Sequence, residues 1–174
     1  MLRERVGTRG VPILAYAMAP GASAGFCLGR ADFGLWPMDP HQMTERLRRL
    51  QPKLTRLLTV SADIDGFGRL REPLSKARIS TSMVLDGKQA LEFASMVQPE
   101  AAVLHLSPGC PGIARAIAGL RANEATRDLP LLVLMDKTAT SGEDAFYTTS
   151  VRQLLSKTEF RFSNLPEEIA RVIG

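Results

Sequence analysis

This sequence has little of several residues that define common protein classes. Its 174 residues include only two cysteines, Cys27 and Cys110, and two histidines, His41 and His105. Two isolated cysteines cannot form the even, closely spaced framework of a small disulfide-stabilised protein, and they stand at no CxxC or Cys/His zinc spacing. We therefore expect both cysteines to be small buried or half-buried residues, and the sequence predicts neither a metal site nor a cofactor.

Long hydrophobic runs are also scarce. The uncharged stretch from Val11 to Gly29 follows several arginines, and Ala22-Ser23-Ala24 imitates a signal-peptide cleavage site, so an exported protein is one reading. Prolines and glycines limit its apolar part to Val11–Ala19, well short of the roughly 20 residues that cross a bilayer. We favour a buried strand here, and expect a cytoplasmic protein without a membrane span.

The composition is otherwise that of a globular protein, with 45% hydrophobic residues and a net charge of +4. The most basic stretch consists of Arg46, Arg48, Arg49, Lys53 and Arg56. It has no interleaved aromatic residues and no recognition-helix signature, so a solvated helix face is favoured over nucleic-acid binding. An anionic nucleotide remains an alternative ligand for this basic surface.

A repeat organises the chain. Gly10–Met18 and Asp128–Asp136 share one pattern: a polar or small residue, an apolar residue, a proline and an apolar run. Each copy continues with a strand-like segment and a helical pattern, Phe33–Pro37 and Asp39–Leu50 in the first, Val151–Lys157 and Leu165–Ile173 in the second. The unit spans about 120 residues. We therefore predict a partial unit at residues 1–52 and a complete unit at residues 53–174.

The complete unit alternates strands and helices. Strands are predicted at Arg56–Val60, Ser80–Leu85, Ala101–Leu106, Leu131–Met135 and Val151–Leu155. Helices are predicted at Gly66–Ala77, Lys88–Val97, Ile113–Ala122 and Leu165–Ile173, with a weak helix or loop at Ser141–Thr149. Alternation of this kind specifies an α/β fold with a parallel sheet covered on both faces.

Four segments of this unit carry a family resemblance: Asp86–Glu92, Pro99–Glu100, Leu120–Pro130 and Leu154–Lys157. In this order they resemble the receiver domain of response regulators in two-component signalling, in particular the tandem receivers of hybrid sensor kinases. The resemblance implies a flavodoxin-like, doubly wound sheet of five parallel strands. It also implies that residues 1–52 are the second half of another receiver, contributing two strands and two helices.

Receivers of this family accept a phosphoryl group on an aspartate after the third strand, beside an acidic pair that holds Mg²⁺, a hydroxyl residue and a lysine. Here a histidine stands at the acceptor position, serine and alanine replace the acidic pair, and methionine replaces the hydroxyl residue. The resemblance therefore implies a degenerate phosphoacceptor pocket at Ser61, Ala62, Asp63, His105, Met135 and Lys157. With one carboxylate where three are expected, Mg²⁺ binding and phosphoryl transfer are not predicted.

The function predicted from these losses is a non-catalytic signalling module of a phosphorelay, acting through protein–protein contacts. Its partner would be a histidine kinase, a response regulator, another signalling protein or a second copy of the chain. One alternative is a sensor that binds a small anion or nucleotide in the vacated pocket or on the basic surface. A phosphoacceptor that uses Asp63 or His105 ranks last. We expect Lys157 to pair with Asp63, and His105 to fill the pocket with a hydrogen bond to a neighbour.

The partial receiver also needs a partner, because two strands and two helices cannot bury both faces of a sheet. It could pack on the edge of the complete receiver, pair with the same half of a second chain, or belong to a longer protein that completes it.

Overall fold

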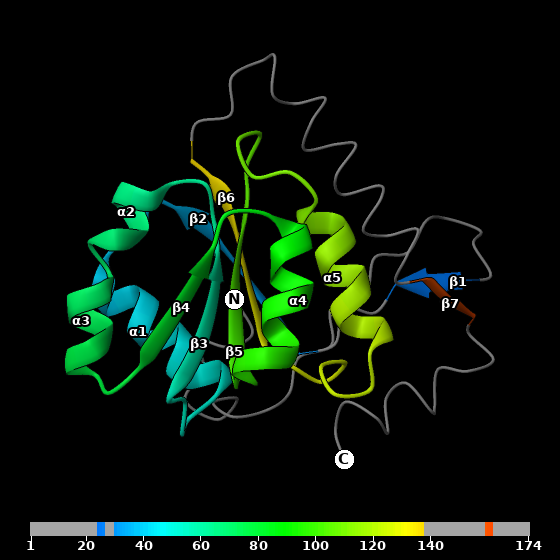
Figure 1. The fold of residues 1–174 in the computed structure, drawn as a ribbon, viewed down its shortest axis with the longest axis horizontal. Helices are drawn as coiled ribbons and strands as arrows, with labels where there is room; N and C mark the ends of the chain where they lie inside the picture. Colours follow the sequence, from blue (N-terminus) through cyan, green and yellow to red (C-terminus); the bar gives the residue numbers. More distant parts are fainter. Residues whose placement is uncertain (1–23, 27–29, 138–158, 162–174) are drawn as a thin grey trace.

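The computed structural model describes residues 24–26, 30–137 and 159–161, with side chains described for 30–137. Its main element is a sheet of five parallel strands in the order β2-β6-β5-β3-β4 (Figure 1). These strands are β2 (Ala31–Trp36), β3 (Arg56–Val60), β4 (Ser80–Val84), β5 (Ala101–Leu106) and β6 (Leu131–Asp136). A separate antiparallel pair joins β1 (Ala24–Phe26) to β7 (Glu159–Arg161). The predicted α/β fold with a five-stranded parallel sheet is confirmed.

Helices cover both faces of this sheet (Figure 1). One face carries α1 (Pro40–Leu50), α2 (Ile64–Gly68) and α3 (Arg71–Lys76), and the other carries α4 (Gly87–Val97) and α5 (Ile113–Ala122). A core of buried hydrophobic side chains lies on each face of the sheet. The central strands contribute to both cores, because alternate side chains of a strand point to opposite faces. Strand β5 is buried along its whole length, as expected of a central parallel strand.

The strand order is flavodoxin-like. Counted from β3 as the first strand, the order β4-β3-β5-β6-β2 reads 2-1-3-4-5, which is the doubly wound arrangement with its switch point between the first and third strands. In such sheets ligands bind outside the carboxyl ends of the strands. The candidate pocket therefore lies where the ends of β3, β5 and β6 meet.

The fifth strand is a correction to the sequence prediction. The position beside β6 is taken by β2, in continuous register from Ala31 opposite Leu131 to Trp36 opposite Asp136. The predicted fifth strand, Val151–Leu155, lies outside the described residues. Both repeat copies carry the same strand-and-helix pattern, so sequence periodicity could not distinguish which of them would pair with β6.

Helix α1 follows β2 and completes this arrangement. Asp39 caps its N-terminus through hydrogen bonds from the backbone N–H groups of His41 and Gln42, and Met43, Leu47 and Leu50 are buried against the sheet. Residues 31–50 thus pack on the edge of the sheet in the same chain, which is one of the three arrangements left open by the sequence for this segment. The division of the chain at residue 52 stays a prediction, although the sheet takes strands from both sides of it.

The helix predicted at Gly66–Ala77 is a second correction, because it is two short helices, α2 and α3. Pro73 has no N–H to donate to the carbonyl four residues earlier, so it is tolerated only in the first turn of a helix, where α3 places it. Gly66 and Gly68 further weaken a continuous helix. The remaining predicted elements between residues 56 and 136 agree with the structure to within a residue or two at each end.

Candidate functional site

A histidine at the carboxyl end of β5 lies in the middle of a chain of hydrogen bonds. His105 is 3% exposed; its Nδ1 lies 2.9 Å from the Oγ of Ser61, and its Nε2 lies 2.9 Å from Oδ1 of Asp136. The backbone N–H of Asp63 donates to the same Ser61 oxygen over 3.0 Å. All of these groups are satisfied when the Ser61 hydroxyl donates to Nδ1 and the Nε2 proton is donated to Asp136.

Serine, histidine and aspartate joined in this way are also the components of a hydrolytic triad, so a nucleophilic role has to be considered. Ser61 is 0% exposed, and its Oγ already accepts one hydrogen bond and contacts the histidine ring. A buried hydroxyl that no substrate can reach cannot attack one. The three side chains therefore act as a structural link between the ends of β3, β5 and β6.

Asp63 is the one carboxylate that the sequence predicts in the pocket, and both of its oxygens accept hydrogen bonds. Its Oδ1 accepts a hydrogen bond from the backbone N–H of Gly66 over 2.9 Å, and its Oδ2 accepts one from the indole Nε1 of Trp36 over 2.8 Å. These bonds, with the Gly66 contribution the larger, hold the pKa of Asp63 below its ordinary value because they stabilise the ionised form. Asp63 is thus a helix cap for α2 and an acceptor for β2.

Aromatic rings close the pocket from the side of β2 and α2. The Trp36 ring stacks on Phe67, with centroids 4.0 Å apart and planes 12° from parallel. The imidazole of His105 lies tilted against both rings, at centroid distances of 5.8 and 5.6 Å. Trp36 is 4% exposed and Phe67 is 6% exposed. The space beside the acceptor position is therefore filled by packed side chains.

The structure brings most of the predicted site residues together. Ser61, Asp63 and His105 are bonded to one another, directly or through the backbone of Asp63. Ala62 is exposed in the loop after β3, and Met135 is half-buried near the end of β6, on the α5 side of the sheet. Lys157 lies outside the described residues, and so does the predicted pairing of Lys157 with Asp63.

Two residues of the site were missed by sequence reasoning, Asp136 and Trp36. Asp136 directly follows Met135, so a shift of one residue in the alignment of β6 would have found it. Trp36 stands in the first repeat where Lys157 stands in the second, and it occupies the site because β2 takes the fifth position of the sheet. The repeat therefore contained the signal, but only the pairing of β2 with β6 shows which copy is used.

No group of three or more metal-ligating side chains comes together in residues 30–137. The carboxylates at the strand ends already accept hydrogen bonds, Asp63 from Trp36 and Gly66 and Asp136 from His105. Within the same residues, no helix is long and apolar enough to cross a membrane.

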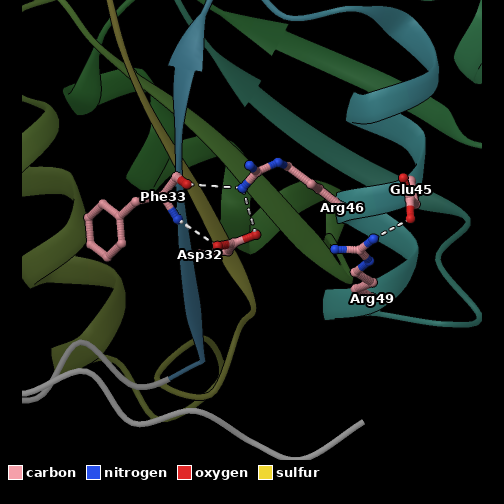
Figure 2. A network of polar contacts seen from close by, with 5 residues as sticks. All are labelled: Asp32, Phe33, Glu45, Arg46 and Arg49. Carbon is pink, nitrogen blue, oxygen red and sulfur yellow. Dashed lines mark hydrogen bonds and ion pairs between the residues drawn. The ribbon is translucent and has the colours of Figure 1, made fainter. Parts of the chain in front are cut away.

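The basic stretch is engaged in local contacts. Figure 2 shows Arg46 reaching from α1 to the carboxylate of Asp32, 3.1 Å away, and to the carbonyl of Phe33, while Arg49 pairs with Glu45 on the same helix. In addition, Arg48 donates to the carbonyls of Pro52, Leu54 and Ala77, and Arg56 pairs with Glu100. Arg46, Arg48 and Arg56 therefore tie α1 and β3 to their surroundings, whereas the contact of Arg49 stays within α1.

No family model matches this sequence, and no curated protein matches it either. One similar solved structure is the signal receiver domain of a signal transduction histidine kinase from Syntrophus aciditrophicus, with 17% identity and a TM-score of 0.41, covering 57% of this chain and 89% of that one. Another is a response regulator protein from Burkholderia multivorans, with 24% identity and a TM-score of 0.40, covering 57% of this chain and 77% of that one. The fold assignment rests on the strand order described above.

Proposed function

We propose that this chain is a receiver-like signalling module that works through protein–protein contacts and does not accept a phosphoryl group. The observation that carries the proposal is that the residue at the acceptor position is a buried histidine whose two ring nitrogens already have partners. His105 stands at the carboxyl end of β5, bonded on both sides to Ser61 and Asp136 and packed against Trp36 and Phe67. In-line phosphoryl transfer needs an accessible acceptor beside a charge-neutralising cation, and this arrangement favours neither.

The remaining carboxylates support the same proposal. Asp63 caps α2 and accepts the Trp36 indole, so binding Mg²⁺ through it would require those hydrogen bonds to be lost. Asp63 and Asp136 also place negative charge at the strand ends, which disfavours an anionic ligand in the vacated pocket. The vacated pocket is therefore a less favourable place for the anion-sensor alternative.

Phosphorylation is tested by incubating the full chain with acetyl phosphate and Mg²⁺ and measuring its intact mass, with an active receiver domain as the positive control. We expect no adduct on this chain under conditions that label the control. A stoichiometric adduct that is stable in acid and labile in base would overturn the proposal.

The interaction mode is tested by size-exclusion chromatography with light scattering on the full chain over a range of concentrations. A reversible dimer would identify a second copy as the partner. A strict monomer would direct the search to a kinase or regulator, which can be examined by titrating purified candidates into this chain with and without its prior treatment with acetyl phosphate. We expect the affinity of such a partner to be the same when this chain alone has been pre-incubated with acetyl phosphate and Mg²⁺ and the reagent has been removed before mixing.

A further inference from the structure

A cavity of about 330 Å³ lies between the sheet and helices α1, α2 and α3, and Phe67 forms part of its wall. Its volume is at the small end of the range of about 300–1,000 Å³ typical of ligand pockets. Most of its lining side chains are apolar, among them Met43 of α1, Leu74 of α3 and Met83 of β4. Methionines make such a wall adaptable, because their side chains are unbranched and flexible.

The cavity lies beside the break that divides the segment after β3 into the two short helices α2 and α3. Gly68 ends α2 at the cavity and contributes no side chain, and a Cβ built on it would meet no atom within 4 Å. Ile64 lines the same space while remaining 57% exposed, so an apolar side chain stands at its rim. A continuous helix at this place would have brought more side chains onto the sheet.

Three polar side chains also reach the cavity: Thr59 of β3, Thr81 of β4 and Arg71 of α3. Thr59 is 5% exposed, Thr81 is half-buried, and Arg71 is exposed. None of the three side chains makes a hydrogen bond or ion pair with another residue of the described part of the chain. The cavity thus combines an apolar interior, two hydroxyls on its floor and one cation at its rim.

We propose that this cavity binds a small amphiphilic carboxylate, such as a medium-chain fatty acid, with its apolar body among the methionines and its carboxylate at Arg71. A guanidinium matches the geometry of a carboxylate, and the apolar wall has the complementary chemistry for an aliphatic chain. This proposal goes beyond the proposed function and does not depend on it, since the cavity lies apart from the acceptor position.

The cavity is joined to the site through Phe67, whose ring contacts both Trp36 and His105. Phe67 lines the cavity and stacks on Trp36, which in turn donates to Asp63. Trp36 is the single tryptophan of the sequence, so its emission reports on this contact without any label. A ligand that displaces Phe67 would also change the packing of Trp36 and His105 at the carboxyl ends of the strands.

Binding is tested by titrating octanoate into the full chain while recording Trp36 fluorescence and the methyl NMR signals of ¹³C-labelled methionines. We expect saturable changes in the emission and in the signals of Met43 and Met83, with little change at Met96, which is 75% exposed. Octyltrimethylammonium, with the opposite charge, should bind at least about fivefold more weakly. Equal binding of the two probes, or no saturable change with octanoate, would overturn the proposal.

Two variants locate the site. Thr81→Phe places a ring in the cavity and should abolish octanoate binding, and Arg71→Gln should weaken it about fivefold. Arg115→Gln, an exposed arginine on α5 at the other face of the sheet, is the matched control and should bind as the unchanged chain does. Circular dichroism verifies that each variant is folded. Octanoate binding that survives Thr81→Phe in a folded variant would place the ligand elsewhere and overturn the assignment.

Discussion

The indole Nε1 of Trp36 donates a hydrogen bond to Oδ2 of Asp63 over 2.8 Å, joining the end of β2 to the loop after β3. We expect Trp36→Phe to lower the free energy of unfolding by about 1–3 kcal/mol, because the carboxylate loses a hydrogen-bond donor. The same substitution should raise the pKa of Asp63, since the Trp36 bond is one of the causes that lower it. Urea unfolding measures the first effect, and carboxyl NMR measures the second.

A double-mutant cycle separates this bond from the loss of ring size. Asp63→Asn is combined with Trp36→Phe, and the non-additive part of the two free-energy changes is the coupling between the side chains. A coupling within experimental error of zero would show that the hydrogen bond contributes nothing to stability.

The low pKa of Asp63 predicts a dependence of stability on pH. Its ordinary value is 3.8, and hydrogen bonds from Gly66 and Trp36 lower it in the folded chain. A carboxyl with a lowered folded pKa contributes stability above its unfolded pKa, and this contribution is lost as the pH falls through the folded value. The difference in unfolding free energy between the unchanged chain and Asp63→Asn should therefore be larger at pH 7 than below about pH 3. Asp65→Asn, in the same helix, controls for the change in net charge.

Periodicity and turn chemistry were sufficient to predict most of the sheet. The runs at Arg56–Val60 and Ala101–Leu106 are β3 and β5 with the predicted bounds, because a buried parallel strand is apolar along its length. The aspartate of the Asp86-Gly87 turn signal caps α4, and Gly87 is its first residue. Such signals are local, so a single sequence displays them.

The composition of the site was less accessible to sequence reasoning, because it depends on long-range pairing. Trp36 reaches Asp63 only because β2 pairs with β6, and the sequence offered a second, similar segment at Val151–Leu155 for the same place. The bonds of His105 require knowledge of side-chain direction at three strand ends. These relations follow from tertiary structure and have no local pattern.

Gly87 and Gly68 form a matched pair for testing the packing of the helices. A Cβ at Gly87 would overlap the carbonyl oxygen of Gly112, so α4 approaches the loop before α5 at a point where only hydrogen fits. Gly87→Ala should cost about 1–3 kcal/mol or more, by overpacking. At Gly68 a Cβ meets no atom within 4 Å, so Gly68→Ala should be neutral or stabilising by up to about 1 kcal/mol. Equal effects on thermal unfolding would contradict this packing.

The contribution of the N-terminal segment to the core is tested in α1. Leu47 is 0% exposed and packs in the same core as Leu57 of β3 and Leu132 of β6. Leu47→Ala should therefore lower the unfolding free energy by about 2–5 kcal/mol. Leu35 is 51% exposed on β2, and Leu35→Ala is the control, expected within about 0.5 kcal/mol of the unchanged chain. If Leu47→Ala were as mild as the control, α1 would not belong to this core in solution.

The contact between Ser61 and His105 predicts that substitutions of the two residues have non-additive effects on the free energy of unfolding. His105→Phe keeps a ring beside Trp36 and Phe67 but removes the acceptor of the Ser61 hydroxyl proton in a fully buried position. It should cost about 1–3 kcal/mol, since a buried polar group that loses its partner still carries its full desolvation penalty. Ser61→Ala alone leaves Nδ1 of His105 and the Asp63 N–H without partners and should cost a similar amount.

Combining the two substitutions removes both polar partners at once. The double variant, Ser61→Ala with His105→Phe, should be more stable than the sum of the single effects predicts, because two apolar groups replace a matched polar pair. Urea unfolding of the four chains gives the coupling directly. Strict additivity would mean that the 2.9 Å contact between Ser61 and His105 does not hold the strand ends together, and the packing of Trp36 and Phe67 would then be the main stabilising contact at this site.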